Sequence, residues 1–286
     1  MEKIDGEKIT ILAETNFRND KRKFGIKRKD RRYHTYIVGK TGVGKSTLIY
    51  NMVLSDLRNG EGLALLDPHG DLVTRILENL PPDRSKDLIY LNPQNGGEAL
   101  SFNPLEVSNP SEGFLVVSSL ISVFKKIWHD SWGPRMEYIL RNALLTLVEF
   151  PNATLFHLQR LLGEEGFRRV LVDKLKDDQL KNFWLNEFEK YSAFFRQEAV
   201  APIQNKIGQF LSSPVLRKVI SQPKSSFDLR KIMDEGKVFL VNLSKGQIGE
   251  DSASLLGAML IAKMGSTALS RQDTKEEERR DFGLHP

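Results

Sequence analysis

The 286-residue sequence predicts an α/β fold with a largely parallel sheet and an all-α domain inserted between its strands. A glycine-rich loop sits between an apolar run and a helix-like run near residue 45. Continuous apolar runs of strand length alternate with helices over residues 34–108 and return at 236–286, which favours a parallel sheet covered on both faces. Helical periodicity dominates residues 109–235, and a basic segment, 1–33, precedes the first expected core strand.

The glycine-rich loop matches the phosphate-binding pattern G-x-x-x-x-G-K-[ST] at every fixed position. The apolar run 36–38 before it predicts a strand, and the run 46–54 after it predicts a helix. Glycines let backbone N–H groups turn toward a phosphate, and the helix N-terminus adds partial positive charge. We therefore expect a nucleotide to contact this loop, whose residues are Gly39, Lys40, Thr41, Gly42, Val43, Gly44, Lys45, Ser46 and Thr47.

Two residues of the loop have expected chemical roles. Lys45 is a candidate catalytic residue because its ammonium can reach the β- and γ-phosphates. The hydroxyl of Ser46 is the expected protein ligand of Mg²⁺. A glycine-rich turn without a ligand is the alternative interpretation, which the flanking strand and helix signals disfavour.

Asp67 is the second candidate catalytic residue. It ends the apolar run 62–66 and begins the sequence Asp-Pro-His-Gly-Asp. Ligands of open α/β sheets bind at the carboxyl ends of strands. If this strand lies beside the phosphate-loop strand, Asp67 can organise Mg²⁺, a water molecule or the loop serine. The alternative is a strand-end turn in which Asp67 caps the next helix.

The remaining elements follow from periodicity and from glycine and proline positions. We expect helices at 72–80, 136–148, 154–162, 165–174, 179–190, 193–211 and 252–269, and strands at 88–93, 237–243 and from 282. The aromatic residues of the helical stretch could stack on bases, but their helical spacing favours a packing role: Trp128, Trp132, Phe183, Trp184, Phe188, Phe194 and Phe195.

Composition narrows the class of protein. The hydrophobic share of 40% is ordinary for a globular chain, and no uninterrupted apolar run approaches the length of a membrane span. The start, Met1–Asp5, lacks the apolar region of a signal peptide. The chain has no cysteine, and its five histidines show no metal-ligand spacing. These features fit a cytoplasmic protein without disulfides.

The net charge of +5 is unevenly distributed, because nine arginines and lysines crowd into residues 18–32 and only Asp20 and Asp30 interrupt them. Such a cluster suits a polyanion such as nucleic acid, and it equally fits a solvated, flexible arm. If the cluster contacts DNA phosphates, binding should weaken steeply with salt and show little sequence preference.

No apolar strand ends in the Asp-Glu pair that a phosphoryl-transfer ATPase normally uses to hold Mg²⁺ and to polarise the attacking water. The strand expected near 238 ends in Asn242, which cannot act as a base. A resemblance accounts for this gap. The ordered set of motifs resembles the HerA/FtsK superfamily of P-loop ATPases and, within it, the coupling proteins of conjugation and type IV secretion. The motifs span nearly the whole chain and are the phosphate loop with residues 30–34, 60–71, 101–105, 132–135, 205–208 and 242–246.

The resemblance implies a RecA-like ATPase core that binds ATP and Mg²⁺, assembles as a homo-hexamer and moves DNA through the ring, with a secretion channel as a possible partner. Coupling proteins usually carry N-terminal transmembrane helices, which this sequence does not show. In the family, the strand corresponding to residues 282–286 continues into the Asp-Glu pair. We therefore expect the chain to be C-terminally truncated and to turn ATP over slowly.

Two other interpretations remain open. The motif Asp67–Gly70 matches the D-x-x-G of small GTPases, and Asn205-Lys206 begins like N-K-x-D. Gly208 replaces the aspartate that would read guanine, however, and the pair lies in a helical stretch. The chain could also be a nucleotide- or DNA-binding remnant without turnover.

Overall fold

The computed structural model describes residues 9–95, 100–107 and 109–286. Residues 1–8, which include the start of the basic segment and the Met1–Asp5 stretch predicted to lack a signal peptide, lie outside the described residues. The chain divides into two compact units. The core unit comprises residues 1–91, 229–242 and 271–286, and the helical unit comprises residues 92–228 and 243–270. The units differ from the expected boundaries, because residues 243–270 group with the inserted helices.

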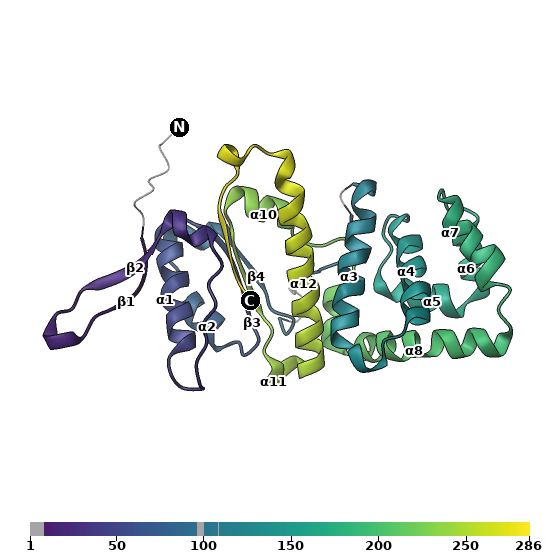
Figure 1. The fold of residues 1–286 in the computed structure, drawn as a ribbon, viewed down its shortest axis with the longest axis horizontal. Helices are drawn as coiled ribbons and strands as arrows, with labels where there is room; N and C mark the ends of the chain where they lie inside the picture. Colours follow the sequence, from purple (N-terminus) through teal and green to yellow (C-terminus); the bar gives the residue numbers. More distant parts are fainter. Residues whose placement is uncertain (1–8, 96–99, 108) are drawn as a thin grey trace. The chain divides into compact units, whose positions relative to one another are not determined.

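A four-stranded parallel sheet forms the centre of the core unit (Figure 1). Its order is β4-β5-β3-β6, with β3 (Gly62–Asp67) paired on one side to β5 (Val238–Asn242) and on the other to β6 (Phe282–His285). The edge strand β4 (Leu88–Leu91) pairs with β5. Every residue of β3 and β5 is buried, as the uninterrupted apolar runs predicted.

Three helices accompany this sheet: α1 (Lys45–Arg58), α2 (Asp71–Glu78) and α10 (Leu229–Glu235). Alternate residues of β3 and β5 face α1 and α2, because side chains alternate between the two faces of a strand. The resulting apolar cluster contains Val53, Leu54, Leu57, Leu63, Leu65, Val73, Ile76, Val238 and Leu240. This packing fixes the phosphate-loop helix α1 against β3.

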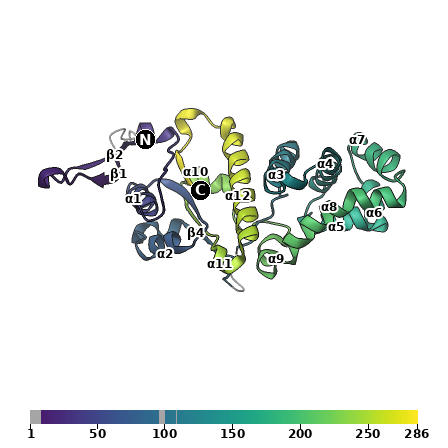
Figure 2. The ribbon, with the colours of Figure 1, turned by 60° about the horizontal axis from the view of Figure 1, so that its bottom comes forward.

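The described part of the basic segment, residues 9–33, forms strands and turns and not the extended arm that the charge pattern allowed. The strands β1 (Ile9–Glu14) and β2 (Lys23–Lys27) form an antiparallel ribbon, closed by the 3₁₀ turn η1 (Phe17–Asn19). A second 3₁₀ turn, η2 (Arg28–Arg32), follows. In Figures 1 and 2 the ribbon extends away from α1, which it contacts near its base. The alternation within residues 23–27 is the strand signal that the charge had obscured.

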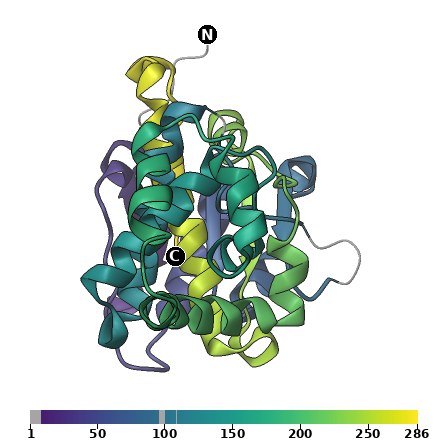
Figure 3. The same cartoon turned by 90° about the vertical axis from the view of Figure 1, so that its right-hand side faces the viewer.

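The helical unit has the predicted helices, with ends shifted by a few residues, and three that were not predicted, at 113–127, 214–220 and 245–248 (Figure 3). Buried Phe183, Trp184 and Phe188 lie on a π-helical turn and contact one another, which confirms the packing role for these three aromatics. The helices are α3 (Gly113–Ile127), α4 (Pro134–Val148), α5 (Leu155–Gly163), α6 (Glu165–Val172), α7 (Asp178–Asn182), α8 (Ala193–Ser212), α9 (Pro214–Ile220), α11 (Lys245–Ile248) and α12 (Glu250–Ser270).

The motif at residues 101–105 connects distant segments of the helical unit. The buried side-chain amide of Asn103 donates to the carbonyls of Ala153 and Pro223, at 2.8 and 2.7 Å, and its oxygen accepts from the N–H of Leu105 at 3.1 Å. A buried amide with its donors and acceptor satisfied holds such segments in register. The motif therefore has a structural explanation within this unit.

One helix in the described part of the chain has the length and composition of a membrane span. It covers Glu250–Asp273, with a mean hydropathy of 1.3 over its most apolar window, and 39% of that window is buried. The helix contains Lys263 and several serines, so it is not the uninterrupted apolar run whose absence the sequence indicated. Helix α12 packs against α3 inside the helical unit, and a core helix passes the same test.

His157 links the stability of the helical unit to pH. Its Nδ1 accepts the backbone N–H of Thr154 at 3.0 Å and closes a capping box at the start of α5. Burial, together with the charge of Arg160, lowers the pKa of His157 below its ordinary value of 6.5. Between these two values the unfolded chain binds more protons than the folded chain, so stability falls as the pH drops below about 6.5.

We predict that His157→Gln makes stability less dependent on pH between 7 and 5, because glutamine can accept the same hydrogen bond without titrating. Thermal unfolding followed by circular dichroism across this range measures the effect. The ordinary carboxylates titrate equally in both proteins. Parallel curves of melting temperature against pH would show that His157 does not contribute.

Candidate nucleotide-binding site

The phosphate loop has the backbone conformation that its glycines permit. Gly42 and Gly44 lie in the left-handed region, at φ of 83° and 95°, where a side chain would be strained. Gly44 is the N-cap of α1, which begins at Lys45. The first N–H groups of a helix have no partner within it, so they are available to an anion. The sequence prediction of a loop followed by a helix is therefore confirmed.

The side chain of Lys45 folds back over its own loop. Its Nζ donates to the carbonyl oxygens of Gly39 and Lys40, both at 2.8 Å. The ammonium therefore lies inside the curve of the loop, at the start of a helix, where positive charge from both sources favours a phosphate. A bound phosphate oxygen would compete with these two carbonyl oxygens for the N–H groups of the Lys45 ammonium.

The other loop residues fit a nucleotide with its metal ion. Gly39–Gly44 are exposed, and the Ser46 and Thr47 side chains are exposed on the first turn of α1. The Ser46 hydroxyl has the chemistry of a Mg²⁺ ligand and stands one residue after Lys45. The loop therefore offers backbone donors, a cation and a hydroxyl at one helix end, which is the set that ATP with Mg²⁺ requires.

The expected strand at Tyr36–Val38 is not formed, which corrects the sequence prediction. Tyr36 is 91% and Val38 76% exposed, and this segment pairs with no strand among the described residues. Both edges of β3 are occupied, by β5 and β6. The idea that β3 lies directly beside the phosphate-loop strand is therefore wrong in this structure. An apolar run of three residues indicates burial, but it does not specify a pairing partner.

Asp67 ends β3 and is buried, with 5% of its surface exposed. One carboxylate oxygen accepts the N–H of His69 at 2.9 Å, and the other accepts those of Leu72 and Val73 at 2.8 and 3.1 Å. These bonds satisfy the first turn of α2, whose N-cap is Gly70. The helix-capping alternative is thus what the structure shows, and a catalytic role for Asp67 stays a prediction.

Other polar side chains line the same edge of the sheet. The register pairs Asp67 with Asn242, so both residues lie at the carboxyl ends of neighbouring parallel strands. The Asn242 amide donates to the hydroxyl of Tyr90, on β4, at 3.4 Å. Three strands therefore present polar groups where ligands of open sheets bind. Sequence reasoning identified Asn242 as the end of a strand but could not place it beside Asp67.

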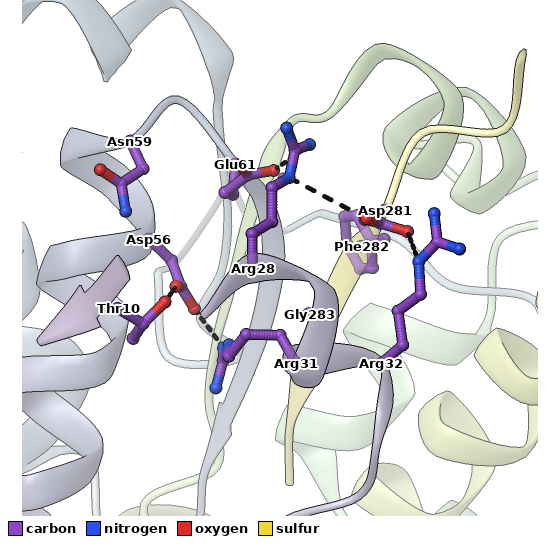
Figure 4. Close-up of a pocket in the computed structure, with 11 residues that line it drawn as sticks. Thr10, Arg28, Arg31, Arg32, Asp56, Asn59, Glu61, Asp281, Phe282 and Gly283 are labelled. Atoms are coloured by element: carbon purple, nitrogen blue, oxygen red, sulfur yellow. Dashed lines mark hydrogen bonds and ion pairs between the residues drawn. The ribbon is translucent and has the colours of Figure 1, made fainter. Parts of the chain in front are cut away.

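A cavity of about 110 Å³ lies at the opposite, amino-terminal edge of the sheet (Figure 4). Arg28, Arg31 and Arg32 enter it from η2, and they face carboxylates of Asp56, Glu61 and Asp281. Arg28 pairs with Glu61 at 3.0 Å, and Arg32 pairs with Asp281 at 3.2 Å. Arg31 pairs with Asp56, and Arg28 also lies 4.0 Å from Asp281.

These ion pairs correct the interpretation of the basic segment as one continuous binding surface. Arg28 and Arg31 are largely buried and neutralised within the core unit. Buried Asp56 also accepts the Thr10 hydroxyl at 2.8 Å, and its carboxylate lies 3.6 Å from Nε2 of His285 on β6. A buried carboxylate depends strongly on its partners, so this cluster ties the N-terminal segment to α1 and β6.

The motif that could have read guanine is not a loop. Asn205 and Lys206 lie within α8, and the Lys206 ammonium donates to the Ser131 hydroxyl and lies 5.4 Å from the centre of the Trp128 ring. These contacts give Lys206 a packing role inside the helical unit. The GTPase interpretation therefore has no structural support at this motif.

The family model described as "Helicase HerA, central domain" matches residues 23–263. The chain belongs to the HerA central-domain family. The match includes the phosphate loop, the helical unit up to α12 and the strands β2, β3, β4 and β5. No match was found among curated proteins.

Solved structures of the bacterial conjugative coupling protein TrwB share the HerA-type fold of this chain. An unbound form of TrwB lacking its first 70 residues aligns with a TM-score of 0.58 and 17% identity, over 99% of this chain and 59% of that one. TrwB with the ATP analogue ADPNP gives 0.54 and 18%, over 86% and 55%. TrwB with ADP and Mg²⁺ gives 0.53 and 18%, over 86% and 54%.

This chain thus spans less than two thirds of the coupling-protein chains that it matches. The family and fold that the sequence motifs predicted are confirmed: a HerA-type P-loop protein whose RecA-like α/β core resembles that of conjugative coupling proteins.

The capping role of Asp67 can be measured directly. We predict that Asp67→Asn lowers the free energy of unfolding by about 1 kcal/mol, because both carboxylate oxygens accept N–H groups and the amide NH2 that replaces one oxygen cannot accept. Urea denaturation measures the change. Asp71→Asn is the matched control, because Asp71 is exposed in the first turn of the same helix. Equal stability of the Asp67 variant and the wild type would contradict the capping role.

Proposed function

We propose that this protein is the ATP-binding part of a DNA-translocating motor of the conjugation-coupling kind, which couples ATP hydrolysis to movement of DNA. The observation that carries the proposal is the phosphate loop of a HerA-family chain, with Lys45 held inside the loop at the start of α1. The TrwB structures support the nucleotide, since that protein was determined with an ATP analogue and with ADP and Mg²⁺.

The residues of the loop divide the work. Backbone N–H groups of residues 42–47 would bind the phosphates, and the Lys45 ammonium, which now donates to the Gly39 and Lys40 carbonyls, would contribute its charge to the β- and γ-phosphates. The Ser46 hydroxyl would hold Mg²⁺, which supplies positive charge to the phosphates when it is bound. Asp67 keeps the α2 turn in place and would act on the metal ion or its water from the same edge of the sheet.

The partners belong to the same proposal. The family implies DNA as a non-specific, backbone-bound partner and a homo-hexamer as the working assembly, with a secretion channel as a further partner. A cytoplasmic location and a role in conjugation, rather than segregation or end-processing, are parts of the proposal that need their own tests. Sedimentation with ATP–Mg²⁺ and DNA tests the assembly.

The phosphate contact of the proposed site is tested at Lys45. Lys45→Ala should weaken ATP–Mg²⁺ binding by about tenfold to a hundredfold, because charge-assisted hydrogen bonds to phosphate contribute about 1.5–3 kcal/mol. Titration with a fluorescent ATP analogue measures the dissociation constant. Lys174→Ala, which removes an exposed lysine of the helical unit, should bind like the wild type. Unchanged affinity in the Lys45 variant would refute the nucleotide site.

A substitution at Ser46 separates metal binding from phosphate binding. Ser46→Ala should lose most of the gain in affinity that Mg²⁺ gives, while its affinity for metal-free ATP changes little. The measurement is the same titration with Mg²⁺ and with EDTA. If both proteins gained equally from Mg²⁺, the hydroxyl of Ser46 would not be a ligand of the metal ion.

A further inference from the structure

The β1–β2 ribbon is an exposed structure with two solvent-facing sides. It is anchored at its base, where the N–H of Ile11 donates to the Ser55 hydroxyl at 3.0 Å and Thr10 donates to Asp56. Among the described residues, the outer half, residues 13–24, forms no side-chain hydrogen bond or ion pair with α1. It is closed by its own hydrogen bonds: Thr15 and Arg22 exchange two, at 2.9 and 3.0 Å. An isolated two-stranded ribbon is marginal in water, so its outer surface is suited to a partner.

The chemistry of the outer half identifies the kind of partner. Residues 13–24 carry four cations, Arg18, Lys21, Arg22 and Lys23, and two carboxylates, Asp20 and Glu14, the latter opposite Lys23 in the ribbon register. Among the described residues only Arg22 of these four forms an ion pair, with Asp20, and both side chains are more than half exposed. Unlike Arg28 and Arg31, which are neutralised in the core unit, these cations face solvent.

Two exposed aromatic rings stand among these cations. Phe17, at the tip, is 71% exposed, and Phe24, on β2, is 51% exposed. The Arg18 guanidinium lies 5.1 Å from the centre of the Phe17 ring. Cations that follow a phosphate backbone, interleaved with rings on which bases stack, are the features by which proteins bind single-stranded nucleic acid without sequence preference.

We propose that the outer half of the β1–β2 ribbon (residues 13–24) binds single-stranded DNA, with Lys21 and Lys23 on phosphates and Phe17 and Phe24 on bases. This inference rests on the proposed function in its choice of DNA. It limits the proposed DNA contact to the ribbon. The second half of the basic segment, η2, instead forms ion pairs within the core unit.

The test uses the full chain and a fluorescent 30-nucleotide oligothymidylate. Phe17→Ser/Phe24→Ser should bind it roughly a hundredfold more weakly, since stacking on each of two bases contributes about tenfold. Lys21→Ala/Lys23→Ala should also bind more weakly, and its plot of log affinity against log salt should be flatter by about 0.7 for each lost phosphate contact. Affinity for ATP should not change in either variant.

Matched controls remove the same residue types elsewhere. Phe194→Ser removes a ring that is 79% exposed, and Lys174→Ala/Lys176→Ala removes two exposed lysines, all from the helical unit. Both controls should bind DNA like the wild type. Because the four substituted ribbon residues are exposed, both variants should fold, and circular dichroism checks this. One variant tests the stacking of bases and the other tests the phosphate contacts.

The outcomes separate the inference from the proposed function. If the wild type binds DNA and both ribbon variants bind equally well, the ribbon inference is wrong and the motor proposal stands. If the wild type binds ATP but no DNA at low salt, both are overturned. If the ribbon variants lose binding only to phosphatidylglycerol vesicles and keep DNA binding, the ribbon is a lipid contact and the inference fails.

Discussion

The pairing of β3 with both β5 and β6 is the constraint on which the core unit depends. It joins residues 62–67, 238–242 and 282–285 into one parallel sheet, although 170 residues lie between β3 and β5 in sequence. Because parallel strands end at the same edge, this pairing places Asp67 beside Asn242. The same pairing places Gly62 and Phe282 together at the opposite edge, where the ion-pair cluster forms. Each edge of the sheet therefore carries its own set of polar groups.

Much of the fold could be predicted from local patterns, and the failures have clear physical reasons. The run 62–67 is apolar throughout and ends in a carboxylate, so its strand was recognisable. Tyr36–Val38 is equally apolar but remains exposed, because strand formation requires a pairing partner that no local pattern specifies. Glycines at 42 and 44 revealed the loop conformation, because only certain backbones need them.

The site was less predictable than the fold, since it depends on which hydrogen bonds a side chain makes. The position of Asp67 at the end of a strand was compatible with a metal site and with a helix cap. The three N–H groups around its oxygens show that it caps the helix, and a role at the metal ion stays a prediction. The arginines of the basic segment show the same limit. Charge alone could not tell Arg31, which pairs with buried Asp56, from Lys21, which faces solvent.

Helix α1 connects these two observations. It begins at Lys45, in the phosphate loop, and carries Asp56 near its other end. Asp56 lies eleven positions after Lys45, which corresponds to about 16 Å along the helix at about 1.5 Å per residue. Apolar packing on β3 holds the middle of α1, while Arg31 and Thr10 hold its far end through Asp56. A nucleotide at Lys45 would therefore act on a helix that the N-terminal segment already restrains. The base of the ribbon contacts the same helix through Thr10 and Ile11, so the phosphate loop and the ribbon are both attached to α1.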